Sequence, residues 1–197
     1  MDAAGISFGR LRSARFLAIS TSLRIVLTPI VVGLVLLDGN DPATAADVAA
    51  ALFCLAAATD WIDGRLARRW NVTTKLGSFL DTTADKLLVT GGLVALVAVE
   101  RASPWIALII IGRELVIMGL RGLIATEGTV MKPSPLGKLK TTVQFVAIAF
   151  AIVRPWGQLA GLYVDEWLML LAAVVTVASA IEYIARSSDL LSLGPAR

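Results

Sequence analysis

Four aspartates on two neighbouring apolar segments are the residues of this sequence best placed to do chemistry. Asp60 and Asp63 lie at the end of one segment, and Asp81 and Asp85 lie near the start of the next. A carboxylate at membrane depth is costly unless it is paired or faces a wet cavity, so such residues are candidate functional residues. Ion pairs with neighbouring arginines would explain any one of the four, but less readily four in register on two successive segments.

Helical spacing gives each segment one acidic stripe. The residues in register are Asp60, Asp63 and Ala67 on the first segment and Gly77, Asp81 and Asp85 on the second, with Gly64 and Arg68 beside the first stripe. At about 100° per residue, each set spans an arc of roughly 60° to 80°. If the stripes face each other across the connection 69–76, the four carboxylates converge at one membrane interface. The small residues there either let the helices approach closely or leave room for a ligand, and beside the aspartates we favour a ligand.

Four carboxylates so close together need a cationic partner, because like charges repel strongly at low dielectric. Arg65, Arg68, Arg69 and Lys86 could neutralise them in part. An all-oxygen set also suits a hard divalent cation such as Mg²⁺ or Mn²⁺, and two ions are a natural number for four aspartates.

Composition excludes other chemistries and indicates a membrane protein. The 197 residues contain no histidine and one cysteine, which excludes histidine-based triads, zinc sites of histidine or clustered cysteine, and an intrachain disulfide. Apolar residues make up 57% of the chain and charged residues 17%, whereas roughly 25% charged is usual in soluble domains. Because a spanning helix needs about 20 mostly apolar residues, six spans would use roughly 120 residues, a number close to the apolar total.

We therefore predict an all-α fold, an integral membrane bundle of six transmembrane helices in a single domain covering residues 1–197. A short segment, 1–15, precedes the first span, and a tail, 186–197, follows the last. The predicted spans are 16–37, 44–62, 77–99, 104–124, 138–153 and 164–185. The first span has no convincing cleavage site, so we expect it to be retained rather than removed as a signal peptide.

Loop charge predicts the orientation in the membrane. Lysine and arginine gather in the N-terminal segment, the second and fourth connections and the C-terminal tail, whereas the other connections are acidic or carry a single arginine. Positive loops stay in the cytoplasm, so we expect both termini and the aspartates on the cytoplasmic side of the plasma (inner) membrane. The formal net charge of +3 is better explained by anionic lipid or phosphate substrates than by nucleic acid.

The residues around the aspartates resemble the signature of the CDP-alcohol phosphotransferases, D-x2-D-G-x2-A-R-x8-G-x3-D-x3-D. The run 60–68 reads DWIDGRLAR and the run 77–85 reads GSFLDTTAD, so every fixed position and every spacing is met. The resemblance implies a metal-dependent enzyme that acts on a CDP-linked lipid, with a fold of six membrane helices. Because dimers are common in that family, it also implies a homodimer.

By this resemblance, Asp60, Asp63, Asp81 and Asp85 would hold two divalent ions, Mg²⁺ or Mn²⁺, against the diphosphate of the donor. The family assigns the fourth aspartate, Asp85, the further role of taking the proton from the acceptor hydroxyl. The cytidine and its phosphate would be accepted by Asp60, Asp63, Gly64, Ala67, Arg68 and Gly77.

A second resemblance concerns the acceptor. Gly112-Arg113-Glu114 and the run 137–141, GKLKT, with Gln144 after it, look like the bacterial phosphatidylglycerophosphate synthases, which join CDP-diacylglycerol to glycerol 3-phosphate. That acceptor carries a phosphate dianion and needs a cationic pocket. The candidates are Arg113, Arg121, Lys138 and Lys140. The alternative for Arg113 is pairing with Glu114 or an aspartate, and for the two lysines it is the charge pattern of cytoplasmic loops.

Other functions remain open at this point. Within the same chemistry, the acceptor could be phosphatidylglycerol, giving cardiolipin, or inositol phosphate. Serine fits less well because it carries no phosphate. A cation-coupled transporter would also contain intramembrane acids, but it would place them near the membrane midplane and often in internally related halves, neither of which this sequence shows.

Overall fold

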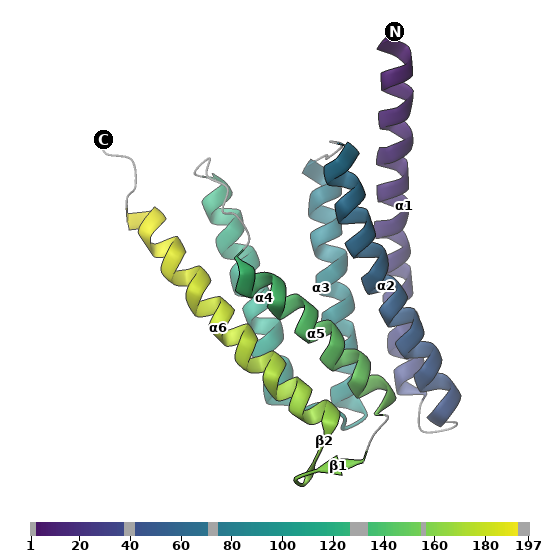
Figure 1. Ribbon diagram of the computed structural model, residues 1–197, viewed down its shortest axis with the longest axis vertical. Helices are drawn as coiled ribbons and strands as arrows, with labels where there is room; N and C mark the ends of the chain where they lie inside the picture. The colour runs from purple at the N-terminus through teal and green to yellow at the C-terminus, as the bar shows by residue number, and fades with distance from the viewer. Residues whose placement is uncertain (1–2, 38–41, 71–74, 127–133, 155–156, 193–197) are drawn as a thin grey trace. The chain divides into compact units, whose positions relative to one another are not determined.

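Helices make up most of the described chain, as predicted (Figure 1). The computed structural model describes the backbone of residues 3–37, 42–70, 75–126, 134–154 and 157–192, and the side chains of 20–37, 44–59, 79–126, 134–154 and 157–188. The helices are α1 (Ala3–Leu36), α2 (Pro42–Trp70), α3 (Lys75–Ala98), α4 (Pro104–Thr126), α5 (Pro135–Val153) and α6 (Val164–Ser192). One helix therefore coincides with each predicted span. The chain divides into two compact units, Met1–Val99 and Glu100–Arg197, which are described separately.

In the first unit, α1 packs against both α2 and α3. Its buried side chains form an apolar core that includes Val31 and Val35 from α1, Phe53 from α2, and Leu88 and Leu96 from α3. Gly91 of α3 lies where α1 comes closest, since a Cβ built there would lie 2.9 Å from Cγ2 of Thr28 and 3.1 Å from Cγ2 of Val32. A side chain at Gly91 would therefore push α1 away from α3.

In the second unit, α6 packs against both α4 and α5. The core combines Ile110 and Ile117 from α4, Ile148 and Ile152 from α5, and Met169 from α6, all nearly inaccessible. Helix α6 is the shared partner, so polar side chains on it can reach residues of both neighbours.

The ends of α5 follow from local sequence. Ser134 is the N-cap, its Oγ accepts a hydrogen bond from the Gly137 amide, and Pro135 occupies the first turn, where its missing N–H costs nothing. Arg154 ends the helix in the left-handed conformation, with φ of 46°, and its amide donates to the Phe150 carbonyl. The Arg154 side chain donates from Nε to Asp165 at 3.2 Å and lies over the Tyr163 ring.

A small antiparallel hairpin that the sequence analysis did not predict joins α5 to α6. Its strands are β1 (Gln158–Leu159) and β2 (Leu162–Tyr163). The two residues between them, Ala160 and Gly161, have φ of 52° and 84°. Positive φ at both central positions suits the right-handed twist of a two-residue hairpin, which explains the turn.

Two of the helices are long and apolar enough to cross a membrane, as judged on the described residues alone, namely Pro135–Val153 and Val164–Ser188. Shorter apolar stretches lie in α1 (Ser20–Leu36) and α2 (Thr44–Thr59). Large apolar side chains are exposed on α4 and α6, among them Trp105, Leu108, Val116, Val174 and Ile181. Exposed apolar surface of this extent is typical of membrane contact or of an interface.

Candidate functional site

The two helices that carry the aspartates are formed as predicted. Asp60 and Asp63 lie in α2, whereas Asp81 and Asp85 lie in α3. The side chains of Asp60, Asp63, Gly64, Ala67, Arg68 and Gly77 lie outside the described residues. The convergence of all four carboxylates therefore stays a prediction.

Asp81 and Asp85 converge on one arginine from α1. Nη1 of Arg24 lies 3.2 Å from Oδ1 of Asp81 and 2.7 Å from Oδ1 of Asp85. Thr21, one helical turn before Arg24, also donates to Oδ1 of Asp81, at 3.5 Å. The predicted acidic stripe on α3 is thus real for these two residues, and it faces α1.

Arg24 is fully buried, with an exposed fraction of 0%. Removing the partner of a buried charge is strongly destabilising, so the two carboxylates and the guanidinium stabilise one another across the α1–α3 interface. The predicted counter-charges were Arg65, Arg68, Arg69 and Lys86, and no role was predicted for Arg24. The missed signal was the presence of a charge inside the apolar run 16–37, since such a charge must pair in the protein interior.

The two carboxylates fit a hard metal ion by donor type and by access. Their side chains are 40% exposed at Asp81 and 32% at Asp85, although Arg24 beside them is inaccessible. Oxygen donors that lie together and open outward are what Mg²⁺ and Mn²⁺ use, usually with water and substrate phosphate completing the shell. Among the side chains that the structure describes, no group of three or more acidic, histidine or cysteine residues could hold a metal ion, so a full site needs donors from elsewhere.

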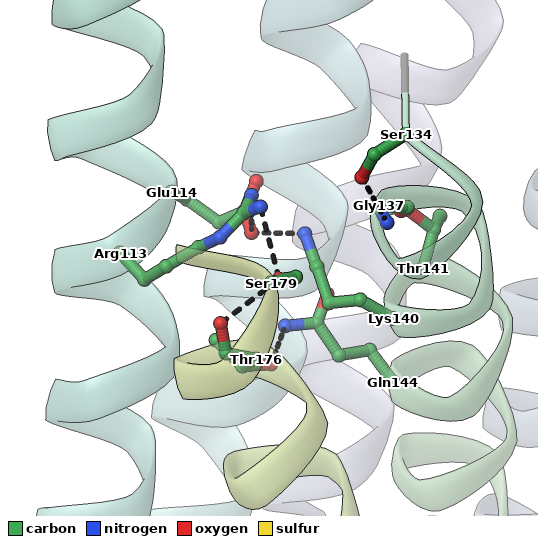
Figure 2. A network of polar contacts seen from close by, with 9 residues as sticks. All are labelled: Arg113, Glu114, Ser134, Gly137, Lys140, Thr141, Gln144, Thr176 and Ser179. Atoms are coloured by element: carbon green, nitrogen blue, oxygen red, sulfur yellow. Dashed lines mark hydrogen bonds and ion pairs between the residues drawn. The ribbon is translucent and has the colours of Figure 1, made fainter. Parts of the chain in front are cut away.

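A second polar cluster lies in the other unit, around Glu114 of α4 (Figure 2). Oε1 of Glu114 accepts a hydrogen bond from Nζ of Lys140 on α5 and lies 3.4 Å from Nη1 of Arg113. All three side chains are almost fully buried, with exposed fractions of 12% or less. Two cations share one carboxylate, so these three described side chains together carry a net positive charge.

Helix α6 completes this cluster with neutral polar groups. Arg113 donates from Nη2 to the Ser179 hydroxyl at 3.1 Å, and Ser179 donates to the Thr176 carbonyl at 2.9 Å. Gln144 of α5 donates from Nε2 to the Thr176 hydroxyl at 3.0 Å. Figure 2 shows these side chains pointing toward one another from α4, α5 and α6. Arg113 and Lys140 were predicted acceptor residues, whereas no role was predicted for Thr176 or Ser179.

The structure brings together only part of the predicted acceptor pocket. Arg113 and Lys140 meet at Glu114, and the pairing of Arg113 with Glu114, considered above as an alternative, is observed. Lys138 is exposed, and Arg121 lies over the Tyr183 ring, 5.4 Å from its centre.

The arrangement can do two things chemically. On α3, paired carboxylates can bind a cation and accept a proton. In the second unit, a buried net positive charge with several hydrogen-bond donors can bind an anion such as a phosphate group. Both capacities suit a reaction that handles phosphate groups.

Comparison with known proteins agrees with that chemistry. The family model of CDP-alcohol phosphatidyltransferases matches residues 18–178, which fall in both compact units. The chain is 43% identical over 180 residues to the CDP-diacylglycerol–glycerol-3-phosphate 3-phosphatidyltransferase of Escherichia coli strain K12, with 87% of this chain and 94% of that protein covered. Proteins of the same description from Shigella flexneri serotype 5b (43%) and Salmonella choleraesuis (42%) match over the same shares.

Proposed function

The chain belongs to the CDP-alcohol phosphatidyltransferase family, and we propose that it transfers the phosphatidyl group of CDP-diacylglycerol to sn-glycerol 3-phosphate. The products are CMP and phosphatidylglycerophosphate, so the protein is an enzyme of phospholipid biosynthesis. The observation that carries this proposal is the identity of 43% with an enzyme of that description over nearly the whole chain.

In the proposed reaction, the acceptor hydroxyl attacks the β-phosphorus of CDP-diacylglycerol. A new P–O bond forms to the acceptor, the bond to the bridging oxygen breaks, and that oxygen leaves with CMP. Asp85 takes the proton of the attacking hydroxyl, since a carboxylate is ionised at neutral pH and the chain contains no histidine to compete. Positioning and electrostatics supply most of the catalysis in such transfers.

The metal requirement follows from the family, which is generally dependent on divalent ions. We propose that Asp60, Asp63, Asp81 and Asp85 would hold two divalent ions, Mg²⁺ or Mn²⁺, which would offset the negative charge on the leaving phosphate. The support from this structure is the pair Asp81 and Asp85, whose partly exposed carboxylates lie together on α3. Gly64, Ala67, Arg68 and Gly77 would take the nucleotide.

For the acceptor, we propose that the phosphate of glycerol 3-phosphate binds beside Arg113 and Lys140. The support from the structure is that these two cations come from different helices and meet at Glu114. Arg121 and Lys138 remain proposed contributors. Phosphatidylglycerol and inositol phosphate are the alternative acceptors of the same chemistry, and both also carry phosphate.

We propose further that all six helices span the plasma (inner) membrane, with both termini and the aspartates facing the cytoplasm. The exposed apolar side chains on α4 and α6 and the two clearly membrane-capable helices support this arrangement. A single catalytic domain built from both units, and assembly as a homodimer, complete the proposal.

The acceptor is tested by product identity. Purified protein is incubated with CDP-diacylglycerol, Mn²⁺ and one acceptor at a time: glycerol 3-phosphate, phosphatidylglycerol, inositol phosphate or serine. Of the four acceptors, we expect only glycerol 3-phosphate to give rapid CMP release and a new phospholipid. A faster reaction with any of the other three would overturn the proposed acceptor, and a lack of CMP release with all four would overturn the enzyme class.

A further inference from the structure

Arg24 joins the two aspartates of α3 through a single atom. Its Nη1 lies within hydrogen-bond distance of Oδ1 of both Asp81 and Asp85. The two carboxylates are four residues apart, so they lie on the same face of α3. Arg24 contacts them from α1, which is about 60 residues earlier in the sequence. The contact fixes where both carboxylates point.

The local structure also fixes Arg24 itself. The side chain is completely buried, and the Thr28 hydroxyl donates to the Arg24 carbonyl at 2.9 Å. The Thr28 methyl group in turn fills the space beside Gly91 of α3, where α1 and α3 come closest. Arg24 is therefore anchored at a close helix contact and is not a mobile surface cation.

From this geometry we propose that Arg24 is a positioning residue for catalysis, holding Asp81 and Asp85 at one place on α3 and offsetting part of their charge. The proposal rests on the proposed function, because it assumes that these aspartates serve phosphatidyl transfer. It assigns Arg24 no contact with either substrate.

A positioning cation next to a metal site has two effects of opposite sign. It orients the carboxylates, so its loss lowers the rate, because misplacement by about 1 Å can cost roughly a hundredfold. It also repels a divalent ion, so its loss leaves the site more negative and strengthens metal binding. A residue that merely supports the fold would lower the rate and weaken metal binding together.

The main test compares Arg24→Gln with the wild-type enzyme in detergent. We expect kcat for CMP release to fall by about a hundredfold, with the KM of each substrate within about threefold of wild type. We also expect Mn²⁺ alone, titrated by electron paramagnetic resonance, to bind at least about threefold more tightly. A kcat within threefold of wild type would overturn the proposal, as would a loss of kcat with weaker Mn²⁺ binding.

Arg154→Gln is the matched control, because it removes an arginine that is also paired with carboxylates but lies at the end of α5. We expect it to lower thermal stability while leaving kcat and Mn²⁺ binding unchanged. If the two variants lose kcat equally, the effect of Arg24 is structural and the proposal fails.

If Arg24→Gln does not fold, Arg24→Lys tests the positioning role of Arg24 instead. Lysine keeps the buried charge, but its ammonium lies one bond closer to the backbone and lacks the planar fork of arginine. We expect Mn²⁺ affinity close to that of wild type and kcat lowered about tenfold. Full kcat in this variant would show that the position of the guanidinium does not matter. If CMP release is absent in the wild-type enzyme as well, the proposed function fails; the titration with Mn²⁺ alone then still tests Arg24, and unchanged or weaker Mn²⁺ binding in Arg24→Gln would overturn its charge-offsetting role.

Discussion

Asp85 makes the shortest contact described at the aspartate site, 2.7 Å to Arg24, compared with 3.2 Å for Asp81. Both contacts come from α1 and hold the carboxylates of α3 in place. Arg24 and the proposed base, Asp85, are therefore in direct contact.

Replacing Asp85 by Asn tests the base. Asparagine keeps the size and can still accept a hydrogen bond from Arg24, but it cannot take up a proton. We expect CMP release to fall by at least about a hundredfold, with the helix content by circular dichroism unchanged. Full activity in purified Asp85→Asn would contradict the assignment of Asp85.

Replacing Glu114 by Gln tests the acceptor cluster. The change removes the charge that holds Arg113 and Lys140 together, and Lys140 is left buried without its counter-charge. A hydrogen bond to a charged group contributes about 1.5–3 kcal/mol, so we expect the KM for glycerol 3-phosphate to rise at least about tenfold. The KM for CDP-diacylglycerol should change little.

The control for that variant is Glu182→Gln on α6. Glu182 also pairs with an arginine, Arg186, at 3.6 Å within its own helix. We expect both KM values to stay as in wild type. An unchanged KM for glycerol 3-phosphate in Glu114→Gln would remove the proposed role of the cluster.

At the scale of helices, hydropathy predicted the existence of each element better than its ends. Helix α2 continues to Trp70, beyond the predicted limit at 62, and α1 begins at Ala3 rather than near 16. A span predicted from hydropathy ends where charged residues begin. The helix itself continues, because arginine, leucine and alanine are good helix formers. The hairpin at 158–163 was missed because its only local signal is the short Ala160-Gly161 turn.

Contacts between helices could be predicted only in part. The motif placed Asp81 and Asp85 on one helix face, and the structure confirms that face. Their partner Arg24 is about 60 residues away, and no periodicity in one segment reveals which residue of another segment lies opposite. Pairing of Arg113 with Glu114 or an aspartate was weighed only as the alternative to a role in the acceptor pocket, and the bond from Lys140 to Glu114 was not predicted.

Gly91 offers a test of the α1–α3 contact. In Gly91→Ala, the new methyl group meets Thr28 Cγ2 at 2.9 Å, so we expect the free energy of unfolding to fall by about 1–3 kcal/mol. Gly33→Ala on α1 is the control, because a Cβ there meets nothing within 4 Å. Thermal unfolding in detergent compares the two, and equal midpoints would contradict the close approach.

At the scale of the molecule, the orientation proposed for the membrane can be tested with single cysteines. Cys54 is the one cysteine of the chain, so Cys54→Ala gives a background to which Ala160→Cys or Ser188→Cys can be added. Both new positions are exposed. We expect a membrane-impermeant maleimide added to intact cells to label Ala160→Cys and not Ser188→Cys, and the reverse pattern would invert the topology.

The family match falls in both compact units, and each unit holds one charged cluster of the proposed reaction. The aspartates with Arg24 lie in the first unit, and Glu114 with its two cations lies in the second. The donor and the acceptor would thus be recognised by separate parts of one chain.

The most direct test of a metal-dependent phosphatidyl transfer is the yield of CMP and lipid product under chelation. Purified enzyme receives CDP-diacylglycerol and radiolabelled glycerol 3-phosphate with Mn²⁺, then excess EDTA, then Mn²⁺ again. We predict that CMP and labelled lipid form in equal amounts. Formation of both products should stop when EDTA is added and resume when Mn²⁺ is added again. Transfer that continues at full rate under EDTA, or CMP formed without labelled lipid, would contradict this account.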